Sequence, residues 1–273
     1  MNKPIIAFIG GGNMATSLIG GLVENGYPAA SIRASDPVES GRQRLSQAFG
    51  IVTSADNRAV CAGAAVVVLA VKPQILKGVA EDLAPSLTAD QVLVSIAAGI
   101  PLTALSTWLG AGQPVVRCMP NTPALVHRGA SGLYANPRVS EAQRDLVGEV
   151  FSAVGTCAWL DAEADIDAVT ALSGSGPAYF FLLMEAMEKA GVALGLDPDT
   201  ARRLTLQTAL GAATMAAASD VDTAELRRRV TSPGGTTERA ILSFVEGGLP
   251  DLVHNAMAAA SQRAKEMADE FSR

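Results

Sequence analysis

The stretch IIAFIGGGNMATSLIGGLVENG, residues 5–26, determines the fold class predicted for the N-terminal half of this chain. An apolar run typical of a buried strand leads into three glycines and then into a helical pattern. Gly10, Gly12 and Ala15 have the spacing GxGxxA. In this motif the first glycine permits a tight turn, the second lets the backbone approach a pyrophosphate, and the small third residue lets the helix pack closely on the strand. Because a helix N-terminus attracts phosphate, this unit predicts a dinucleotide site, with a plain tight turn as the alternative.

The following residues repeat this alternation of short apolar runs and helical patterns. Runs such as AAVVVLAV (residues 64–71) and QVLVSIAAG (residues 91–99) are each followed by a helical pattern, which is typical of crossover units that build a mostly parallel sheet. Residues 64–71 are apolar at every position, as a strand buried on both faces requires. We therefore expect this strand at the centre of the sheet.

The pattern changes at about Asp165, after which helical windows separated by glycine, proline and capping residues replace the strands. The predicted fold is an α/β Rossmann-type N-terminal domain with a mostly parallel sheet, plus an all-helical C-terminal domain. We place the dinucleotide-binding domain at residues 1–162 and the helical domain at residues 163–273. The apolar fraction is 49%, and much of the excess is alanine, leucine and valine on long helical stretches, which favours an oligomer that buries helix faces.

Asp36 ends the second predicted strand, at the position where an acidic residue commonly accepts hydrogen bonds from the adenosine ribose. Its charge would repel a 2′-phosphate and so favours NADH, although Arg33, Arg42 or Arg44 could reach a phosphate instead. Alternatively, Asp36 caps a helix opened by Pro37. The coenzyme preference stays open on these residues.

Two further strand ends are expected at the carboxyl edge of the sheet, where ligands of open α/β sheets bind. Pro73 suits the first position of a helix, which leaves Lys72 facing either the cofactor cleft or solvent. The segment SIAAGI, residues 95–100, ends another strand with small side chains. These residues allow a flat ring to lie close, or serve packing alone.

The stretch SPGGTT, residues 232–237, lies between two predicted helices and places two glycines where a helix would start. We expect Ser232 to be the N-cap and Pro233 the first helical residue. The N–H groups of Gly234, Gly235 and Thr236 would then be free to bind an anion, for which a carboxylate is a suitable size. The alternative is that the glycines only let another helix approach. The similar segment SGSG, residues 173–176, is as typical of a helix crossing as of a binding loop.

Composition excludes several other classes of function. The net charge of −6, without a basic stripe, argues against nucleic acid. The most apolar window, residues 176–195, contains Glu185, Glu188 and Lys189, so we expect a core helix and no membrane span. No signal peptide pattern is seen, so we expect a cytoplasmic protein. The three cysteines have no metal-site spacing, and two histidines without a nucleophile elbow argue against acyl transfer.

The motifs GGGNMA, LAVKPQ, SIAAGI, RCMPNTPALVHRGASGLYA, ALSGSGPAYFF and VTSPGGTTERA occur in an order and spacing that resemble bacterial pyrroline-5-carboxylate reductase over essentially the whole chain. The SPGGTT block is far more specific to that family than the glycine triplet. The resemblance implies reduction of L-1-pyrroline-5-carboxylate to L-proline by NADPH or NADH, the last step of proline biosynthesis. It also implies that the helical domain serves dimerisation and substrate binding.

The resemblance also implies site residues, and no metal is among the ligands. For the coenzyme they are Gly10, Gly11, Gly12, Asn13, Met14, Asp36, Asn57, Ala70, Val71, Lys72, Pro73, Ala97, Ala98 and Gly99. For the substrate, together with the loop pattern above, they are Asp220, Ser232, Gly234, Gly235, Thr236 and Thr237, with Asp220 close to the site from a partner subunit. The Thr237 hydroxyl is expected near the ring nitrogen, as the catalytic group. Asp36 departs from family members that use NADPH, which tend to have a neutral or phosphate-binding residue there.

The expected chemistry needs little acid–base machinery, because a protonated cyclic imine is already electrophilic. A β-hydroxyacid dehydrogenase is a rival, but it would need a lysine base near Phe180, and Lys189 and Lys265 do not fit that position. A reductase of another imine and a non-catalytic dinucleotide-binding regulator are further alternatives. We expect a homodimer, in which close helix approach explains the small residues of TLQTALGAATMAAAS (residues 205–219); a higher ring of dimers stays open.

Overall fold

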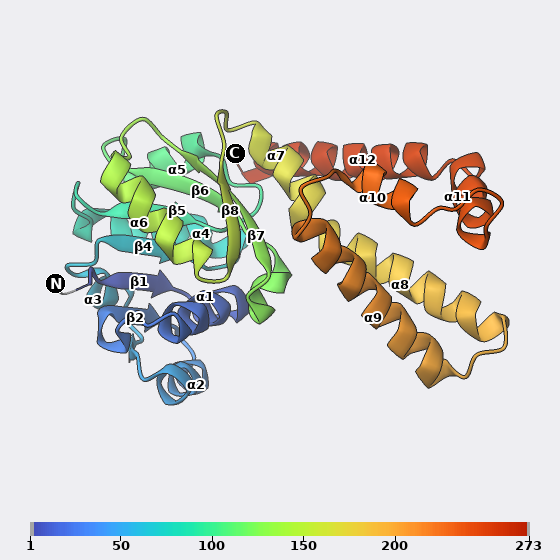
Figure 1. Ribbon diagram of the computed structural model, residues 1–273. Coiled ribbons are helices and arrows are strands. Elements are labelled where there is room, and N and C mark those ends of the chain that lie inside the picture. The colour runs from blue at the N-terminus through green and yellow to red at the C-terminus, as the bar shows by residue number, and fades with distance from the viewer. Residues whose placement is uncertain (1–2, 272–273) are drawn as a thin grey trace. The chain divides into compact units, whose positions relative to one another are not determined.

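The computed structural model describes residues 3–271, which fall into two compact units (Figure 1). The first unit contains the chain up to Ser175 together with the segment from Ala259 onward, and the second is Gly176–Ala258. The strands are β1 (Ile6–Ile9), β2 (Ile32–Ser35), β3 (Val52–Ser54), β4 (Val66–Leu69), β5 (Val92–Ser95), β6 (Val115–Met119), β7 (Gly129–Ala135) and β8 (Gly155–Trp159). The helices are α1 (Asn13–Glu24), α2 (Glu39–Phe49), α3 (Asn57–Cys61), α4 (Pro73–Leu83), α5 (Leu102–Leu109), α6 (Glu141–Ser152), α7 (Asp165–Val169), α8 (Gly176–Ala193), α9 (Pro198–Ala217), α10 (Thr223–Arg229), α11 (Thr236–Glu246) and α12 (Leu249–Phe271). Three short 3-10 helices, η1 (Ala29–Ser31), η2 (Ala84–Ser86) and η3 (Thr122–Val126), and one π-helical segment, η4 (Thr170–Gly174), complete the set in the described residues.

In the first unit the strands form one sheet in the order β3-β2-β1-β4-β5-β6-β7-β8. All neighbouring strands are parallel except β6 and β7, which are antiparallel. This confirms the prediction of a mostly parallel sheet. The central position of β4 is also confirmed: Val66 and Val68 pack into the core on one face, and Val67 and Leu69 into the core on the other.

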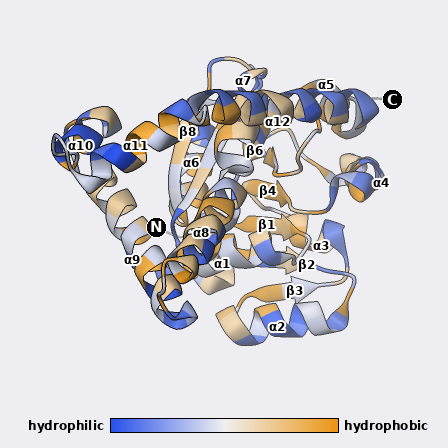
Figure 2. Ribbon diagram, turned by 90° about the vertical axis from the view of Figure 1, so that its right-hand side faces the viewer, coloured by the Kyte–Doolittle hydropathy of each residue, from blue (hydrophilic) through white to orange (hydrophobic). Residues whose placement is uncertain are grey.

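Helices cover both faces of this sheet, as crossover connections require. On one face α1 and α6 contribute side chains such as Leu18, Ile19 and Phe151, none of which is exposed to solvent. On the other face α4 and α5 contribute Leu76 and Leu105, which are equally buried. Figure 2 shows the central strands β1 and β4 coloured as hydrophobic, in agreement with their burial.

The two compact units do not follow the domain boundary expected at residues 162 and 163. The structure divides after Ser175, because α7 and η4 contact strands of the sheet in the first unit. The C-terminal half of α12 also belongs to the first unit, where Phe271 packs against the core beside α4 and α5. Beyond Trp159 no strand occurs in the described residues, so the expected helical character of the C-terminal part is confirmed.

The second unit is built around a hairpin of α8 and α9. These helices approach closely where a Cβ on Gly191 would lie 3.3 Å from the Cβ of Ala201. Among its described residues only Gly176, Ala201 and Thr205 are buried. The expectation that residues 176–195 form a core helix is therefore wrong for the single chain: Phe180 and Leu182 are 65% and 68% exposed.

The helical stretch Asp165–Ala193 has the length and mean hydropathy of a membrane span, and it is the one such stretch among the described residues. Length and composition alone support that possibility, and a single such helix is weak evidence for a membrane protein. The three cysteines are free thiols; Cys61 and Cys118 are buried and Cys157 is partly buried.

Candidate functional site

The turn between β1 and α1 requires its first glycine and leaves space at its third. Gly10 has a φ of 102°, and a Cβ on it would lie 2.7 Å from the carbonyl oxygen of Ala70. Gly12 is the N-cap of α1, and a Cβ there would meet nothing within 4 Å. Gly10 is thus needed by the fold, whereas Gly12 borders open space that a ligand could fill.

The N-terminus of α1 suits a phosphate group. The N–H groups of Asn13, Met14 and Ala15 occupy the first turn, where an α-helix offers them no carbonyl partner. No acidic side chain lies in this turn to compete for them, and Ala15 is buried against the core. The chain therefore fits the pyrophosphate of a dinucleotide at this turn, as the spacing predicts.

Asp36 follows β2 directly and binds the backbone of the glycine turn. Its Oδ2 accepts the N–H of Gly11 at 3.1 Å, and its Oδ1 accepts the N–H of Val38 at 2.8 Å. The helix α2 begins at Glu39, so Asp36 orders the chain ahead of the helix without being its N-cap. The carboxylate therefore joins the end of β2 to the turn that follows β1.

Two of the three arginines considered as phosphate ligands point at backbone oxygens of the same region. The Arg42 guanidinium donates to the carbonyls of Asp36 and Pro37 at 2.7 and 3.0 Å, and that of Arg44 donates to the carbonyl of Gly11 at 3.1 Å. Arg33 donates instead to the carbonyl of Ala62. In this conformation the charge next to the glycine turn consists of one carboxylate flanked by engaged guanidinium groups.

The remaining predicted coenzyme residues follow strands that lie side by side in the sheet. Ala70 and Val71 follow β4, Lys72 is the N-cap of α4, and Pro73 is its first residue, as expected. Residues 97–99 follow β5, the parallel neighbour of β4. Asn57 is the first residue of α3, behind the N-cap Asp56. The sheet thus brings these segments to one edge.

The segment after β5 is held by the C-terminal half of α12, which belongs to the same compact unit. Gly99 has a φ of 75°, and a Cβ on it would lie 2.9 Å from the Cβ of Met267 and 3.4 Å from the Phe271 ring. Any other residue would therefore be strained and would push against α12. Sequence patterns gave no sign of this contact.

In the second unit, the helix after SPGGTT begins later than expected. The N-cap of α11 is Gly235 and the first helical residue is Thr236, so the expectation that Ser232 is the cap and Pro233 the first residue is wrong. Gly234 has a φ of 72°, a left-handed conformation that forms a turn ahead of the helix. The glycine at 234 is required by this turn.

The amides that remain available also differ from the prediction. The N–H of Gly235 donates to the carbonyl of Ser232 at 3.0 Å, and that of Gly234 donates to the Glu238 carboxylate at 2.7 Å. Helix geometry instead leaves the N–H groups of Thr236, Thr237 and Glu238 without a carbonyl partner. The side chains of Thr236 and Thr237 are exposed. An anion would thus meet threonine amides and hydroxyls.

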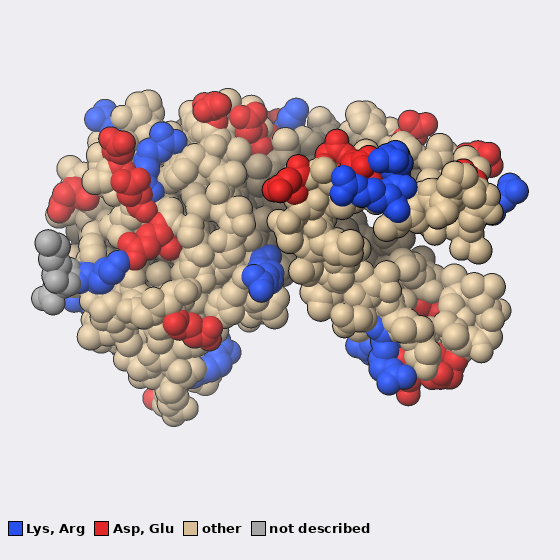
Figure 3. All heavy atoms as spheres, viewed as in Figure 1, with Lys and Arg blue, Asp and Glu red and all other residues tan. Residues whose placement is uncertain are grey.

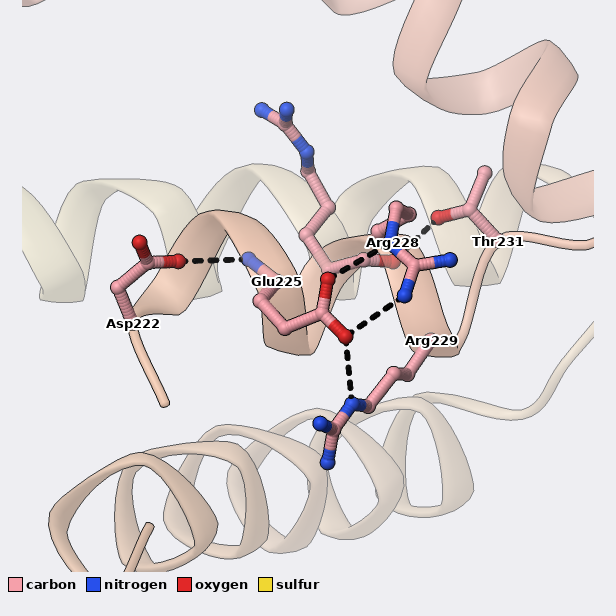
Figure 4. Close-up of polar contacts among 6 residues, drawn as sticks. Asp222, Glu225, Arg228, Arg229 and Thr231 are labelled. Atoms are coloured by element: carbon pink, nitrogen blue, oxygen red, sulfur yellow. Dashed lines mark hydrogen bonds and ion pairs between the residues drawn. The ribbon is translucent and has the colours of Figure 1, made fainter. Parts of the chain in front are cut away.

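The segment ahead of this turn is a short charged helix, α10, shown in Figure 4. Asp222 caps it by accepting the N–H of Glu225 at 2.8 Å, and the Glu225 carboxylate binds Arg228 and Arg229. The hydrogen bonds from Arg228 and Arg229 hold the pKa of Glu225 below its ordinary value. Figure 3 shows the arginines of α10 as a basic cluster beside acidic residues. Asp220, in the preceding loop, is exposed.

Three structural residues of these regions were missed by sequence analysis. Asn121, 8% exposed, donates to the carbonyl of Ser173 at 3.0 Å and accepts the N–H of Ala130 at 2.8 Å, which fixes the segment before α8. Arg117 forms a 2.6 Å ion pair with Glu163. Asn121 and Arg117 lie within the quoted RCMPNTPALVHRGASGLYA motif, so the motif was the available signal, although it gave no roles.

Comparison with known proteins identifies the relatives of this chain. A family model described as pyrroline-5-carboxylate reductase dimerisation matches residues 163–267, and one described as NADP oxidoreductase coenzyme F420-dependent matches residues 5–99. The pyrroline-5-carboxylate reductase of Pseudomonas aeruginosa is 61% identical over 271 residues, which cover 99% of each chain.

Solved structures give the same result. A pyrroline-5-carboxylate reductase from Coxiella burnetii has a TM-score of 0.94 at 44% identity, over 98% of this chain and 99% of that one. The Plasmodium falciparum pyrroline carboxylate reductase with NADP bound has a TM-score of 0.86 at 29% identity, over 98% and 99%. The chain therefore belongs to the pyrroline-5-carboxylate reductase family.

Proposed function

We propose that the glycine turn of the first unit and the SPGGTT turn of the second carry the two ligands of one reaction. The chain is an NAD(P)H-dependent oxidoreductase that reduces L-1-pyrroline-5-carboxylate to L-proline, the last step of proline biosynthesis. The observation that carries this conclusion is the 61% identity to a reductase of that name over 99% of both chains.

The first unit would hold the coenzyme through backbone groups. The amides of Asn13 and Met14 would receive the pyrophosphate, Gly12 would leave room for it, and Asp36 would face the adenosine ribose. The ends of β4 and β5, Ala70 to Pro73 and Ala97 to Gly99, together with Asn57, would line the remainder. The bound coenzyme supplies the hydride.

The second unit would hold the substrate carboxylate at the N-terminus of α11. The structure favours the Thr236 and Thr237 amides and their hydroxyls as the anion ligands, in place of the Gly234 and Gly235 amides expected from the sequence. Ser232 would add a hydroxyl from the turn. Asp220 would act from a partner subunit, consistent with its exposure.

Thr237 would act by orientation. Its hydroxyl oxygen would accept a hydrogen bond from the protonated ring nitrogen, so that hydride adds to C5 and the π electrons of the C=N bond become the nitrogen lone pair of a secondary amine. No strong acid is needed, because the substrate already carries the proton. This role requires only an exposed hydroxyl at a fixed place on a rigid helix, which Thr237 has.

The second unit would also form the dimer. The family match shows a dimerisation region at residues 163–267, so the chain assembles into an oligomer. A homodimer would cover the apolar side chains of α8 and α9, including the stretch with the composition of a membrane span, and this favours a cytoplasmic enzyme without membrane contact. A ring of such dimers is a further proposal on the same surface.

The test is turnover of pyrroline-5-carboxylate with NADPH and NADH, followed by the absorbance of the reduced nicotinamide and by detection of proline. We expect proline to appear in step with coenzyme oxidation. Binding of coenzyme without turnover would favour the regulator, and turnover only with another cyclic imine would favour a different imine reductase. Turnover of a β-hydroxy acid with oxidised coenzyme would favour the dehydrogenase.

A further inference from the structure

The turn Ser232–Gly235 has little packing to hold its shape. Ser232, Pro233 and Gly234 are exposed, and a Cβ at Gly234 would meet nothing within 4 Å. Two hydrogen bonds define the turn: the Gly235 N–H to the Ser232 carbonyl at 3.0 Å, and the Gly234 N–H to the Glu238 carboxylate at 2.7 Å. Only the second bond comes from a side chain.

The contact of Glu238 differs from an ordinary capping box. In a capping box the third helical residue accepts the N–H of the N-cap itself. Here that N–H belongs to Gly235 and is already donated to Ser232, and Glu238 reaches one residue further, to Gly234. The Glu238 carboxylate therefore holds Gly234, the left-handed residue of the turn, through a hydrogen bond to its N–H group.

The first turns of α1 and α11 differ in whether they contain an acidic residue. The first turn of α1 contains no acidic residue, whereas Glu238 lies in the first turn of α11. A carboxylate at a helix N-terminus is stabilised by the helix dipole, yet it could compete with an incoming anion. Because Glu238 is bound to Gly234, its carboxylate has a partner other than the amides of Thr236 and Thr237.

We infer that Glu238 is a positioning residue for the substrate: its carboxylate oxygen holds Gly234 in the left-handed turn that aligns Ser232 with the Thr236 and Thr237 amides. This inference rests on the proposed substrate site at α11. It assigns Glu238 no contact with the reacting atoms. The property that matters is a hydrogen-bond acceptor on a side chain of this length.

The test compares Glu238→Ala, which removes the acceptor, with Glu238→Gln, which keeps an acceptor oxygen at the same length. For Glu238→Ala we expect the KM for pyrroline-5-carboxylate to rise roughly tenfold, with the KM for the coenzyme within about twofold of wild type. Glu238→Gln should stay close to wild type. Glu246→Ala, at the exposed other end of α11, is the matched control.

A readout independent of activity is hydrogen exchange of the peptide covering residues 231–238, measured by mass spectrometry on the intact enzyme. Exchange should be faster in Glu238→Ala than in wild type or Glu238→Gln. An unchanged substrate KM in Glu238→Ala, equal loss in Glu238→Gln, or a parallel rise in the KM for coenzyme would each overturn the inference. Lack of wild-type turnover would instead refute the proposed function, and the exchange experiment would still test the contact.

Discussion

Thr237 is the second residue of α11, and its side chain is exposed next to amides that have no helical partner. We expect Thr237→Ala to lower kcat/KM by one to two orders of magnitude, about 1.4 to 2.7 kcal/mol, because the imine loses its orienting hydrogen bond. Steady-state kinetics with direct measurement of coenzyme affinity checks this. Thr223→Ala, on the exposed first position of α10, is the control. A large loss of coenzyme binding would contradict the assignment.

Asp36 places a carboxylate beside the glycine turn, where a 2′-phosphate would add negative charge to negative charge. We expect Asp36→Ser to shift the ratio of kcat/KM values toward NADPH by about tenfold, since the repulsion is lost while Arg42 and Arg44 remain. Some affinity for both coenzymes should be lost with the bond to Gly11. Equal effects on NADH and NADPH would show that Asp36 only orders the turn.

Single residues could be predicted from the sequence where a local rule decides their conformation. Gly10 and Pro73 lie where the strand–turn–helix pattern placed them, and Asp36 directly follows the strand that it was expected to end. The start of α11 could not be predicted, because Ser-Pro is an ordinary helix start and the competing turn depends on a left-handed Gly234 and a bond from Glu238. Such a side-chain contact leaves no periodicity to detect.

At the scale of elements, α12 and the segment after β5 restrict one another through Gly99. We expect Gly99→Ala to weaken coenzyme binding at least about tenfold, because the left-handed conformation costs about 1 kcal/mol or more and the new Cβ would press on Met267. Calorimetric titration with coenzyme measures this. Gly112→Ala, where a Cβ would meet nothing within 4 Å, is the matched control. Similar affinities in the two variants would contradict the assignment.

Asp167 on α7 gives a prediction about pH. Burial raises the pKa of its carboxyl above the ordinary 3.8, although the nearby Arg117 and Lys265 charges act in the opposite direction. The folded state therefore binds this proton more tightly than the unfolded chain does. The stability from this proton is complete below pH 3.8 and is lost as the pH rises through the raised pKa.

Asp167→Asn should therefore unfold at higher denaturant concentration than wild type at neutral pH, and the difference should shrink toward about pH 4. Denaturant unfolding at several pH values measures this, with Asp161→Asn as the exposed control. If instead wild type loses stability relative to Asp167→Asn as the pH falls toward 4, the ionised carboxylate is the stabilising form, through Arg117 or Lys265.

Elements of the first unit were predictable because burial on two faces leaves continuous apolar runs, as in β4. The return of α12 to that unit was not predictable. Its contact joins Gly99 to Met267, and residues so far apart along the chain produce no local pattern. For the same reason the number of boundaries was not predictable. The change in periodicity indicated a single boundary, whereas the compact units divide after Ser175 and again before Ala259.

At the scale of the whole molecule, the second unit cannot bury a core of its own. We expect its stability to depend on assembly, so the melting temperature should rise with protein concentration. Leu210→Asp, on a residue of α9 that is 63% exposed, should shift the protein to a smaller, less stable species in sedimentation experiments. Ile75→Asp, at a 55% exposed position of α4 outside the dimerisation match, is the control. An unchanged oligomer in Leu210→Asp would show that α9 does not face a second copy.

The return of α12 also has a consequence for the order in which the protein acquires its structure during synthesis. Met267 and Phe271 leave the ribosome only after the whole of the second unit, yet they pack on the loop at Gly99 in the first. Domains generally fold in the order of their translation, but here the first unit cannot be finished before the second has been synthesised. In a nascent chain arrested before α12, the sheet should therefore be formed while the loop after β5 lacks its fixed conformation.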